Sequence, residues 1–205
     1  PQGNTNPDSL RLIFSSALFD NGYVGLLQGV QPLDTLQSRS LRKKTPRNND
    51  FQIPQGLTQS RQGVYWLADE ALGDTSNALI IYRGVYDPQQ DTIGFSEQTR
   101  FPLSVDSANQ SGLAGWHIDF DPNGRYGWAV ITTQLRQGPD YPTNYPVTFY
   151  TSDSGKTWSG PHAMLLDSLQ AVQNQIVGNE PYAAPNYDMT VDSAGQLHMA
   201  LQISP

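Results

Sequence analysis

The side chains that could carry out acid–base or metal chemistry are few and scattered in this 205-residue chain. Its three histidines, His117, His162 and His198, stand far apart without the spacing of metal ligands, and there is no cysteine. Asp119 and Asp121 alternate along one predicted strand and could form a carboxylate pair, although Asp121 is better explained as the first residue of a turn. No Gly-x-Ser-x-Gly, P-loop or dinucleotide fingerprint occurs. We therefore predict no catalytic residue, no metal site and no cofactor.

The most distinctive polar cluster lies in the stretch TFYTSDSGKTWSG, residues 148–160. A run of β-forming residues meets an acidic, glycine-bearing turn, and an aromatic residue follows at once. The carboxylate of Asp153 can accept hydrogen bonds from nearby backbone N–H groups, and Gly155 can adopt a positive φ. The ring of Trp158 can be buried between neighbouring sheets. These features predict a self-contained structural turn and no reactive role.

One strand–turn–strand pattern occurs twice, in residues 116–130 and 187–201. The matching pairs are Asp121 and Asp192, Gly124 and Gly195, and Ala129 and Ala200, each 71 positions apart (192 − 121, 195 − 124, 200 − 129). In the short Asp-x-x-Gly turn the glycine supplies the positive φ that a tight turn needs. A fainter third copy runs over residues 51–68. The sequence therefore predicts a repeated hairpin.

Hairpins of a second kind, with Asp-Asn-Gly or Asp-Pro turn signals, lie between these copies. The two kinds alternate, so together they divide the chain into four-stranded units. In chain order these are the second half of a unit at 9–33, whole units at 51–103 and 115–168, and the first half of a unit at 185–204. Residues 34–50 hold five cations within nine positions and are predicted to form a polar basic insertion loop.

Four antiparallel strands repeated at this spacing describe the blades of a β-propeller. The predicted fold class is all-β: a β-propeller of four-stranded antiparallel blades, with about three blades' worth present. Propellers close with roughly 4–8 blades, so we predict that residues 1–205 are a partial β-propeller whose remaining blades come from the same product. Completion by other chains is the alternative, and a β-sandwich is the competing fold.

Residues 151–158, Thr-Ser-Asp-Ser-Gly-Lys-Thr-Trp, match the pattern Ser/Thr-x-Asp-x-Gly-x-Thr-Trp at every defined position. The chain thereby resembles the BNR, or sialidase-type, Asp-box β-propeller repeat family. In that family the box lies between the third and fourth strands of a blade, on the outer rim. The resemblance implies a structural role for the box residues, which are Thr151, Asp153, Gly155, Thr157 and Trp158.

The same resemblance makes a sialidase-like glycoside hydrolase the alternative function. The first blade of that family carries an aromatic-Arg-Ile-Pro strand, whose arginine binds the substrate carboxylate. Residues 51–54 here read Phe-Gln-Ile-Pro, and the neutral amide of Gln52 cannot replace a bidentate guanidinium. We therefore predict a non-catalytic module. In the alternative, the catalytic residues of the hydrolase lie partly outside this chain.

Aromatic residues in two proline-bearing loops are candidate ligand contacts. Tyr141 and Tyr145 flank one loop, and Tyr182 begins the other. Such rings can stack on sugars or peptides at the mouth of a propeller, although they can equally close turns over the sheet edges. The predicted function is accordingly binding of a protein or glycan partner, or a part in surface or structural assembly.

Composition limits the remaining classes of protein. The chain has 12 basic and 19 acidic residues, a net charge of −7, which argues against nucleic-acid binding. No apolar run approaches the roughly 18 residues that can cross a bilayer. The chain begins with proline and shows no signal sequence, so we expect a processed or partial product. The acidic, cysteine-free composition resembles large exported bacterial proteins, which predicts an extracellular, cell-surface or periplasmic location.

Overall fold

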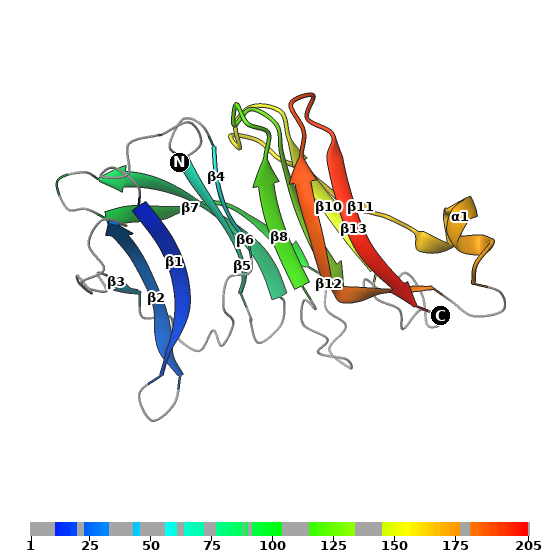
Figure 1. Ribbon diagram of the computed structural model, residues 1–205, viewed down its shortest axis with the longest axis horizontal. Coiled ribbons are helices and arrows are strands. Elements are labelled where there is room, and N and C mark those ends of the chain that lie inside the picture. The colour runs from blue at the N-terminus through cyan, green and yellow to red at the C-terminus, as the bar shows by residue number, and fades with distance from the viewer. Residues whose placement is uncertain are drawn as a thin grey trace.

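The computed structural model of the chain describes residues 11–19, 23–32, 43–45, 56–60, 64–71, 77–87, 89, 92–103, 115–133, 145–176 and 181–204. Within these residues the fold is all-β, and neighbouring strands pair antiparallel. Figure 1 shows the sheets side by side along the long axis of the molecule, from the blue N-terminal strands to the red C-terminal ones. The prediction of an all-β chain with antiparallel sheets is confirmed.

The first sheet contains β1 (Arg11–Phe19), β2 (Tyr23–Pro32) and β3 (Lys43–Thr45), in the order β1-β2-β3. β3 pairs with the middle of β2. The prediction of an insertion loop over 34–50 is therefore wrong at Lys43–Thr45. The physical reason is that β2 offers an open row of backbone N–H and C=O groups, and a short charged strand is a common way to cover such an edge.

Two sheets have four strands each, which follow one another in space as they do in the chain. The second sheet consists of β4 (Gly56–Gln59), β5 (Val64–Ala71), β6 (Asn77–Asp87) and β7 (Thr92–Leu103). The third consists of β8 (Gly115–Phe120), β9 (Gly127–Thr133), β10 (Tyr145–Thr151) and β11 (Ser159–Ala163). These two sheets lie within the segments 51–103 and 115–168, which the repeated hairpins divided into four-stranded units.

A short helical segment leads from the third sheet to the fourth. It contains η2 (Leu166–Ser168) and α1 (Gln170–Gln173), and it precedes β12 (Tyr182–Val191) and β13 (Leu197–Ser204). β12 and β13 pair only with each other among the described strands. Their register shifts in the segment that contains Pro185, where the missing backbone N–H interrupts the ladder.

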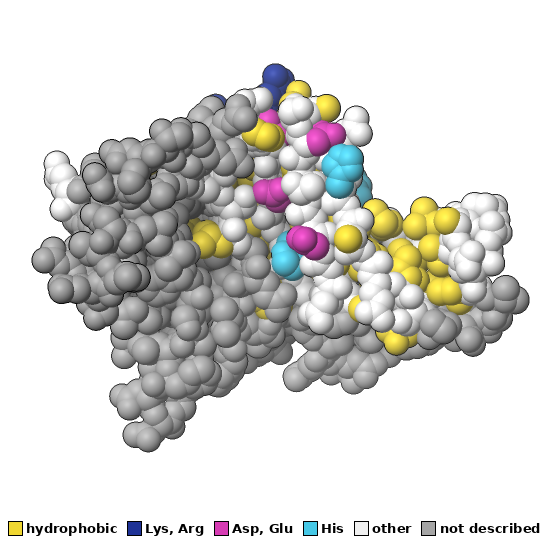
Figure 2. Space-filling view, viewed as in Figure 1, with side chains coloured by type: hydrophobic (Ala, Val, Ile, Leu, Met, Phe, Trp, Pro, Cys, Tyr) yellow, Lys and Arg dark blue, Asp and Glu magenta, His cyan; other side chains and the backbone are white. Residues whose placement is uncertain are grey.

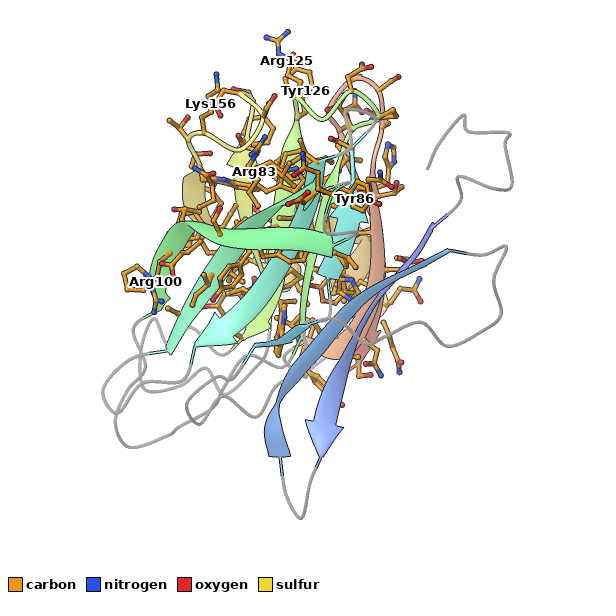
Figure 3. All side chains as sticks on the ribbon, turned by 90° about the vertical axis from the view of Figure 1, so that its left-hand side faces the viewer. Arg83, Tyr86, Arg100, Arg125, Tyr126 and Lys156 are labelled. Carbon is orange, nitrogen blue, oxygen red and sulfur yellow. The ribbon has the colours of Figure 1, made fainter. Side chains whose placement is uncertain are left out.

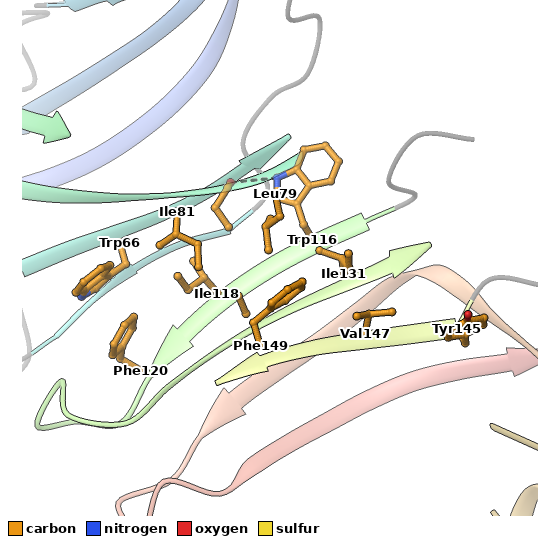
Figure 4. Packing of buried hydrophobic residues seen from close by; sticks show 12 residues of the cluster. Trp66, Leu79, Ile81, Trp116, Ile118, Phe120, Ile131, Tyr145, Val147 and Phe149 are labelled. Atoms are coloured by element: carbon orange, nitrogen blue, oxygen red, sulfur yellow. Dashed lines mark hydrogen bonds between the residues drawn. The ribbon is translucent and has the colours of Figure 1, made fainter. Parts of the chain in front are cut away.

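The main core lies between the second and third sheets. Alternate residues of the facing strands are buried there, as the two-residue period of a strand requires. The cluster comprises Trp66, Ala68, Leu79, Ile81, Trp116, Ile118, Phe120, Ala129, Ile131, Tyr145, Val147 and Phe149. Figure 4 shows these side chains meeting between the strands, and the ring centroids of Trp66 and Phe120 lie 4.5 Å apart. This apolar layer fixes the relative position of the two sheets.

The sheets also meet along their first strands. β8, at one edge of its sheet, contacts β4 of the preceding sheet and β12 of the following one. β8 also contacts β5, and β12 contacts β9, so β8 and β12 each touch the first and second strands of the sheet before them. β12 thus contacts the third sheet through the same strands as β8 contacts the second sheet.

Candidate functional site

The two Asp-x-x-Gly turns are built alike. In the first, the Asp121 carboxylate accepts hydrogen bonds from the backbone N–H groups of Asn123, Arg125 and Tyr126. In the second, Asp192 accepts from Ala194 and Gln196. The glycines, at positions 124 and 195, have φ values of 70° and 80°. The repeated turn and its positive-φ glycine are confirmed, and both aspartates are occupied in holding their own turns.

The offset of 71 does not hold beyond the turns. Asp121 N–H donates to the carbonyl of Tyr126, five residues on, whereas Asp192 N–H donates to the carbonyl of Gln196, four residues on. The second turn is therefore one residue shorter, and the offset between the returning strands is 70. Since His198 lies opposite residue 190 and Trp128 opposite residue 119, Trp128 is the counterpart of His198. The match of Ala129 with Ala200 was wrong by one residue, a slip that changes the face of a strand.

Successive turns pack against one another. A Cβ added to Gly124 would lie 2.5 Å from the Cβ of Ser60, which ends the β4 side of the preceding hairpin. A Cβ added to Gly195 would lie 2.6 Å from the ring of Tyr126, in the turn between β8 and β9. The indole N–H of Trp128 also donates to the carbonyl of Gly195, at 2.9 Å. The turn glycines are required by this close approach as well as by φ.

On β8 and on β12, an aromatic residue bonds to the second strand of the preceding sheet. The indole N–H of Trp116 on β8 donates to the carbonyl of Ala68 on β5 at 3.1 Å, and both residues are buried. The hydroxyl of Tyr187 on β12 donates to the carbonyl of Val130 on β9. Burial raises the pKa of Tyr187 well above its ordinary value, so the phenol stays a donor. Trp116 and Tyr187 are 71 positions apart (187 − 116), so one bond is the repeat of the other.

Asp119 joins three consecutive first strands. Its carboxylate accepts from the hydroxyl of Thr58 on β4 at 2.7 Å and from the backbone N–H of Val191 on β12 at 3.0 Å. From the sequence, Asp119 could form a carboxylate pair with Asp121. Its partners are instead in the two neighbouring sheets, so the described contacts give it a bridging role.

His117 lies next to Asp119 on β8 and is half-buried between β8 and β12. Its ring meets the edge of the Tyr187 ring, with centroids 4.8 Å apart. Burial lowers the pKa of His117, and the negative charge of Asp188 opposes this shift. Figure 2 shows acidic and histidine side chains gathered over β8, β12 and β13 on this face of the molecule. His198 and Asp192 also approach each other, with their Nε2 and Oδ2 atoms 3.1 Å apart.

The Asp-box forms a compact network around one carboxylate. Asp153 accepts from the hydroxyl of Thr157 at 2.6 Å, from the backbone N–H of the same residue at 2.9 Å, and from the hydroxyl of Thr151 at 2.9 Å. The backbone N–H of Gly155 donates to the Thr151 hydroxyl at 3.0 Å. These bonds, that of the Thr157 hydroxyl above all, lower the pKa of Asp153 to about 2. The carboxylate is thus fully engaged within the turn.

The Asp-box meets the preceding sheet at Gly155, and its Trp158 packs on the core between the two sheets. Gly155 has a φ of 76°, and a Cβ added there would lie 2.3 Å from the six-membered ring of Trp66 on β5. The indole of Trp158 donates to the Gly155 carbonyl at 3.1 Å, and its ring meets the edge of Phe120 with centroids 5.9 Å apart. Trp158 packs against the main core between the two sheets. The turn is therefore packed where the second and third sheets meet.

The Asp-box and the Asp-x-x-Gly turn lie at the same end of the third sheet. The backbone N–H of Ser154 donates to the carbonyl of Arg125 at 2.9 Å. The Arg125 guanidinium lies over the ring of Tyr126, 5.0 Å from its centroid. Figure 3 shows Arg125, Tyr126 and Lys156 together at this end. Cationic side chains thus lie at an end of the sheet whose aspartates, Asp121 and Asp153, are occupied by hydrogen bonds within their own turns.

The structure separates the three tyrosines predicted as ligand contacts. Tyr141 lies outside the described residues. Tyr145 is in β10, is only 8% exposed and belongs to the main core, so its assignment to a ligand-facing loop is corrected to a packing role. Its two-residue spacing to the apolar residues 147 and 149 could have signalled a core position. Tyr182, at the start of β12, is 40% exposed and remains a candidate contact.

Other predicted features are located only in part. Phe51–Pro54, with Gln52 in the place of the sialidase arginine, lies outside the described residues. His162 is exposed on β11. Among the residues that the structure describes, no group of three or more His, Cys, Asp or Glu side chains could hold a metal ion. The described part of the chain also has no helix long and apolar enough to cross a membrane.

Comparison with known proteins adds no relative. No protein-family model matches the chain, and neither the curated proteins nor the solved structures gave a match.

Proposed function

We propose that the chain is a segment of an Asp-box β-propeller. Three observations support this arrangement: β8 contacts both β4 and β12, Trp116 and Tyr187 make the same bond to the preceding sheet, and the Asp-box lies between the third and fourth strands of its sheet. If the same rotation relates each sheet to the next, the sheets form a ring in which the first strands surround the central axis. A sandwich, by contrast, needs only two sheets packed face to face.

We propose further that this segment is a non-catalytic, exported module that binds a protein or a glycan. The observation that carries this proposal is the use of four aspartates in the turns and between the strands. Asp121, Asp153 and Asp192 hold their own turns, and Asp119 joins neighbouring strands. Acid–base catalysis needs a carboxylate free to reach a substrate, whereas these four are engaged in building the scaffold.

Tyr182 marks the end of the scaffold at which binding is proposed. β12 runs from Tyr182 to the Asp192 turn, so Tyr182 lies at the end of its sheet opposite the Asp-x-x-Gly turns. It is 40% exposed, and an exposed phenol ring can stack on a sugar or a prolyl peptide. The strands that complete the partial sheets come either from the same product, as the sequence analysis predicts, or from another chain.

The binding proposal is tested on a glycan array and a panel of immobilised peptides. Tyr182→Ala should weaken the binding of whichever probe the wild type retains, while Tyr182→Phe, which keeps the ring, should bind it nearly as well. Thermal melting must show that both variants fold as the wild type does. Equal binding by all three proteins would contradict the role of Tyr182, and binding to no probe would contradict the proposed function.

The alternative, a sialidase-like hydrolase, is tested with a fluorogenic sialoside. We expect no turnover above a heat-denatured control, because glutamine stands at position 52. Measurable turnover would replace the binding module by the hydrolase and would leave the proposed fold in place.

A further inference from the structure

His117 lies at the junction between the third and fourth sheets. It belongs to β8, opposite Val130 of β9, and its ring centroid is 4.8 Å from that of Tyr187 on β12. The hydroxyl of Tyr187 donates to the carbonyl of Val130, so one tyrosine contacts both residues of the pair. Tyr187 is 8% exposed and Val130 is fully buried. Histidine is the side chain that changes charge near neutral pH, and here it lies beside the bond that joins two sheets.

The surroundings of the His117 ring favour its neutral form. No hydrogen bond joins either ring nitrogen to another residue in the described part of the chain. Protonation adds a charge and a second N–H donor, and a half-buried cation without an acceptor loses hydration that nothing replaces. Burial accordingly lowers the pKa of His117 from its ordinary value of 6.5.

Two carboxylates lie near this ring. Asp188 on β12 is exposed, accepts the backbone N–H of Met189, and opposes the effect of burial on His117. Its attraction is weakened because water and salt screen an exposed charge. Asp119, two residues along the same face of β8, already accepts one hydrogen bond from each neighbouring sheet. Neither carboxylate therefore offsets the burial of the imidazole.

The other strands that contact β8 bring no charge to this ring. β9 and β4 contain no charged residue. β5 meets the opposite face of β8, where its Trp66 and Ala68 side chains belong to the apolar core. The phenol of Tyr187 is the remaining titratable group in contact with the ring, and burial keeps it protonated.

The junction between the second and third sheets has no imidazole at this position. Counting back four residues from the N–H that closes each turn gives the equivalent positions on three first strands, which are Gly56, His117 and Asp188. The first of these has no side chain. The bond across that earlier junction comes from the indole of Trp116, which does not titrate. The chain thus contains a junction with the histidine and a matched one without it.

We propose that His117 makes the attachment of the fourth sheet to the third sensitive to acid. The neutral ring packs beside Tyr187, whereas the protonated ring turns toward water and gives up that contact. Only the attached form buries the ring, so only that form is destabilised by the added charge. Acid therefore favours a form in which β12 and β13 are released from the third sheet while the second and third sheets stay joined. The proposal uses contacts between described sheets alone and holds whether or not the sheets form a ring.

The direction of the effect follows from proton linkage. The released ring has the ordinary pKa of 6.5, whereas the attached ring has a lower one, so the released form takes up the proton first as the pH falls. The attachment is at full strength above pH 6.5. It weakens as the pH drops from there toward the lower pKa, and it does not weaken further below that pKa. Each pH unit between the two pKa values changes the equilibrium about tenfold.

Two indole N–H groups report the two junctions separately. The N–H of Trp128 donates to the carbonyl of Gly195 across the third and fourth sheets, and that of Trp116 donates to Ala68 across the second and third. Their hydrogen exchange is followed by NMR from about pH 8 to about pH 5 and corrected for the intrinsic effect of pH. Protection of Trp128 should fall in acid, and protection of Trp116 should not. Equal losses at both indoles, or no loss at Trp128, would overturn the proposal.

The pKa of His117 is measured in the same samples from the chemical shifts of its ring. It should lie below 6.5, and the loss of protection at Trp128 should agree with the tenfold relation between pKa and equilibrium. A pKa at or above 6.5, or a junction that becomes more protected in acid, would contradict the proposal.

His117→Gln keeps a polar side chain that takes up no proton in this range. The part of the pH dependence at Trp128 that comes from position 117 should disappear in this variant. Any contribution of the pair His198 and Asp192 remains, because both residues are still present. A variant with the full pH dependence of the wild type would show that His117 is not the group responsible.

An aspartate variant tests the electrostatics without changing the ring. Asp188→Asn removes the attraction that opposes burial, so the pKa of His117 should fall further and the total loss of protection in acid should grow. Asp167→Asn, which removes an exposed carboxylate on η2, is the matched control and should change neither. A pKa of His117 that rises in Asp188→Asn, or that moves equally in both variants, would overturn the proposed balance.

Discussion

Replacing Gly155 with alanine forces a side chain into the contact between the Asp-box and the preceding sheet. The φ of 76° at this position is one that alanine adopts only with strain, at a cost of about 1–2 kcal/mol. The added Cβ would also lie 2.3 Å from the ring of Trp66, and overpacking of this kind costs about 1–3 kcal/mol. We therefore expect a loss of roughly 2–5 kcal/mol in the free energy of unfolding.

Thermal and urea unfolding, followed by far-ultraviolet circular dichroism, measure this loss. For a chain of this length each kcal/mol lowers the melting temperature by about 2–4 °C, so Gly155→Ala should lower it by about 4–20 °C. Gly94→Ala is the matched control, because no atom lies within 4 Å of the added Cβ at this exposed strand position. It should change the melting temperature little or raise it slightly.

A double-mutant cycle with Trp66→Phe separates the clash from the backbone strain. Phenylalanine lacks the outer indole atoms that the added Cβ would meet, so the combined variant should lose less stability than the two single losses added together. The expected coupling is about 1–3 kcal/mol. Strictly additive losses would refute the contact between Gly155 and Trp66. They would also refute the packing of the Asp-box between the second and third sheets.

Two further variants test other contacts. Thr157→Val removes the largest cause of the low pKa of Asp153, so a carboxyl-carbon NMR titration should show that pKa rise toward its ordinary value. The folded pKa of Asp153 is depressed to about 2 from 3.8, so its stabilising effect is present above about pH 4 and is lost as the pH falls toward 2. Between these pH values the free energy of unfolding of Thr157→Val should fall less than that of the wild type. A pKa of Asp153 that is unchanged in the variant would contradict the hydrogen-bond network. Tyr187→Phe removes the hydroxyl that donates to the buried Val130 carbonyl. It should lower the free energy of unfolding by about 1–2 kcal/mol, or the melting temperature by about 2–8 °C. The exposed control Tyr182→Phe should melt as the wild type does, and equal melting of both would contradict the bond between the sheets.

Much of the strand architecture could be predicted from the sequence because its turns have strong local signals. Asp121 and Gly124 determine their turn through bonds within a few residues, and local chemistry of that kind can be read from adjacent positions. The network around Asp153 is local in the same way. The core position of Tyr145 also follows from alternation, although its neighbouring prolines suggested a loop.

The contacts between sheets could not be predicted in the same way. Asp119 bonds to Thr58 and Val191, 61 and 72 residues away, and no local pattern specifies such partners. The pair Trp116 and Tyr187 did carry a signal, since both are aromatic at an offset of 71, but their acceptors are backbone carbonyls without a sequence signature. The short strand β3 is likewise determined by the open edge of β2 and not by its own charged residues.

A crystal structure of the 205-residue chain would test most directly whether its sheets surround one axis. We predict that the rotation from the second sheet to the third equals that from the third to the fourth, within the roughly 45–90° that a ring of 4–8 blades requires. β4, β8 and β12 should line the axis, with Trp116 and Tyr187 each bonded to the preceding sheet. Two sheets packed face to face as a sandwich, or two unequal rotations, would contradict the propeller.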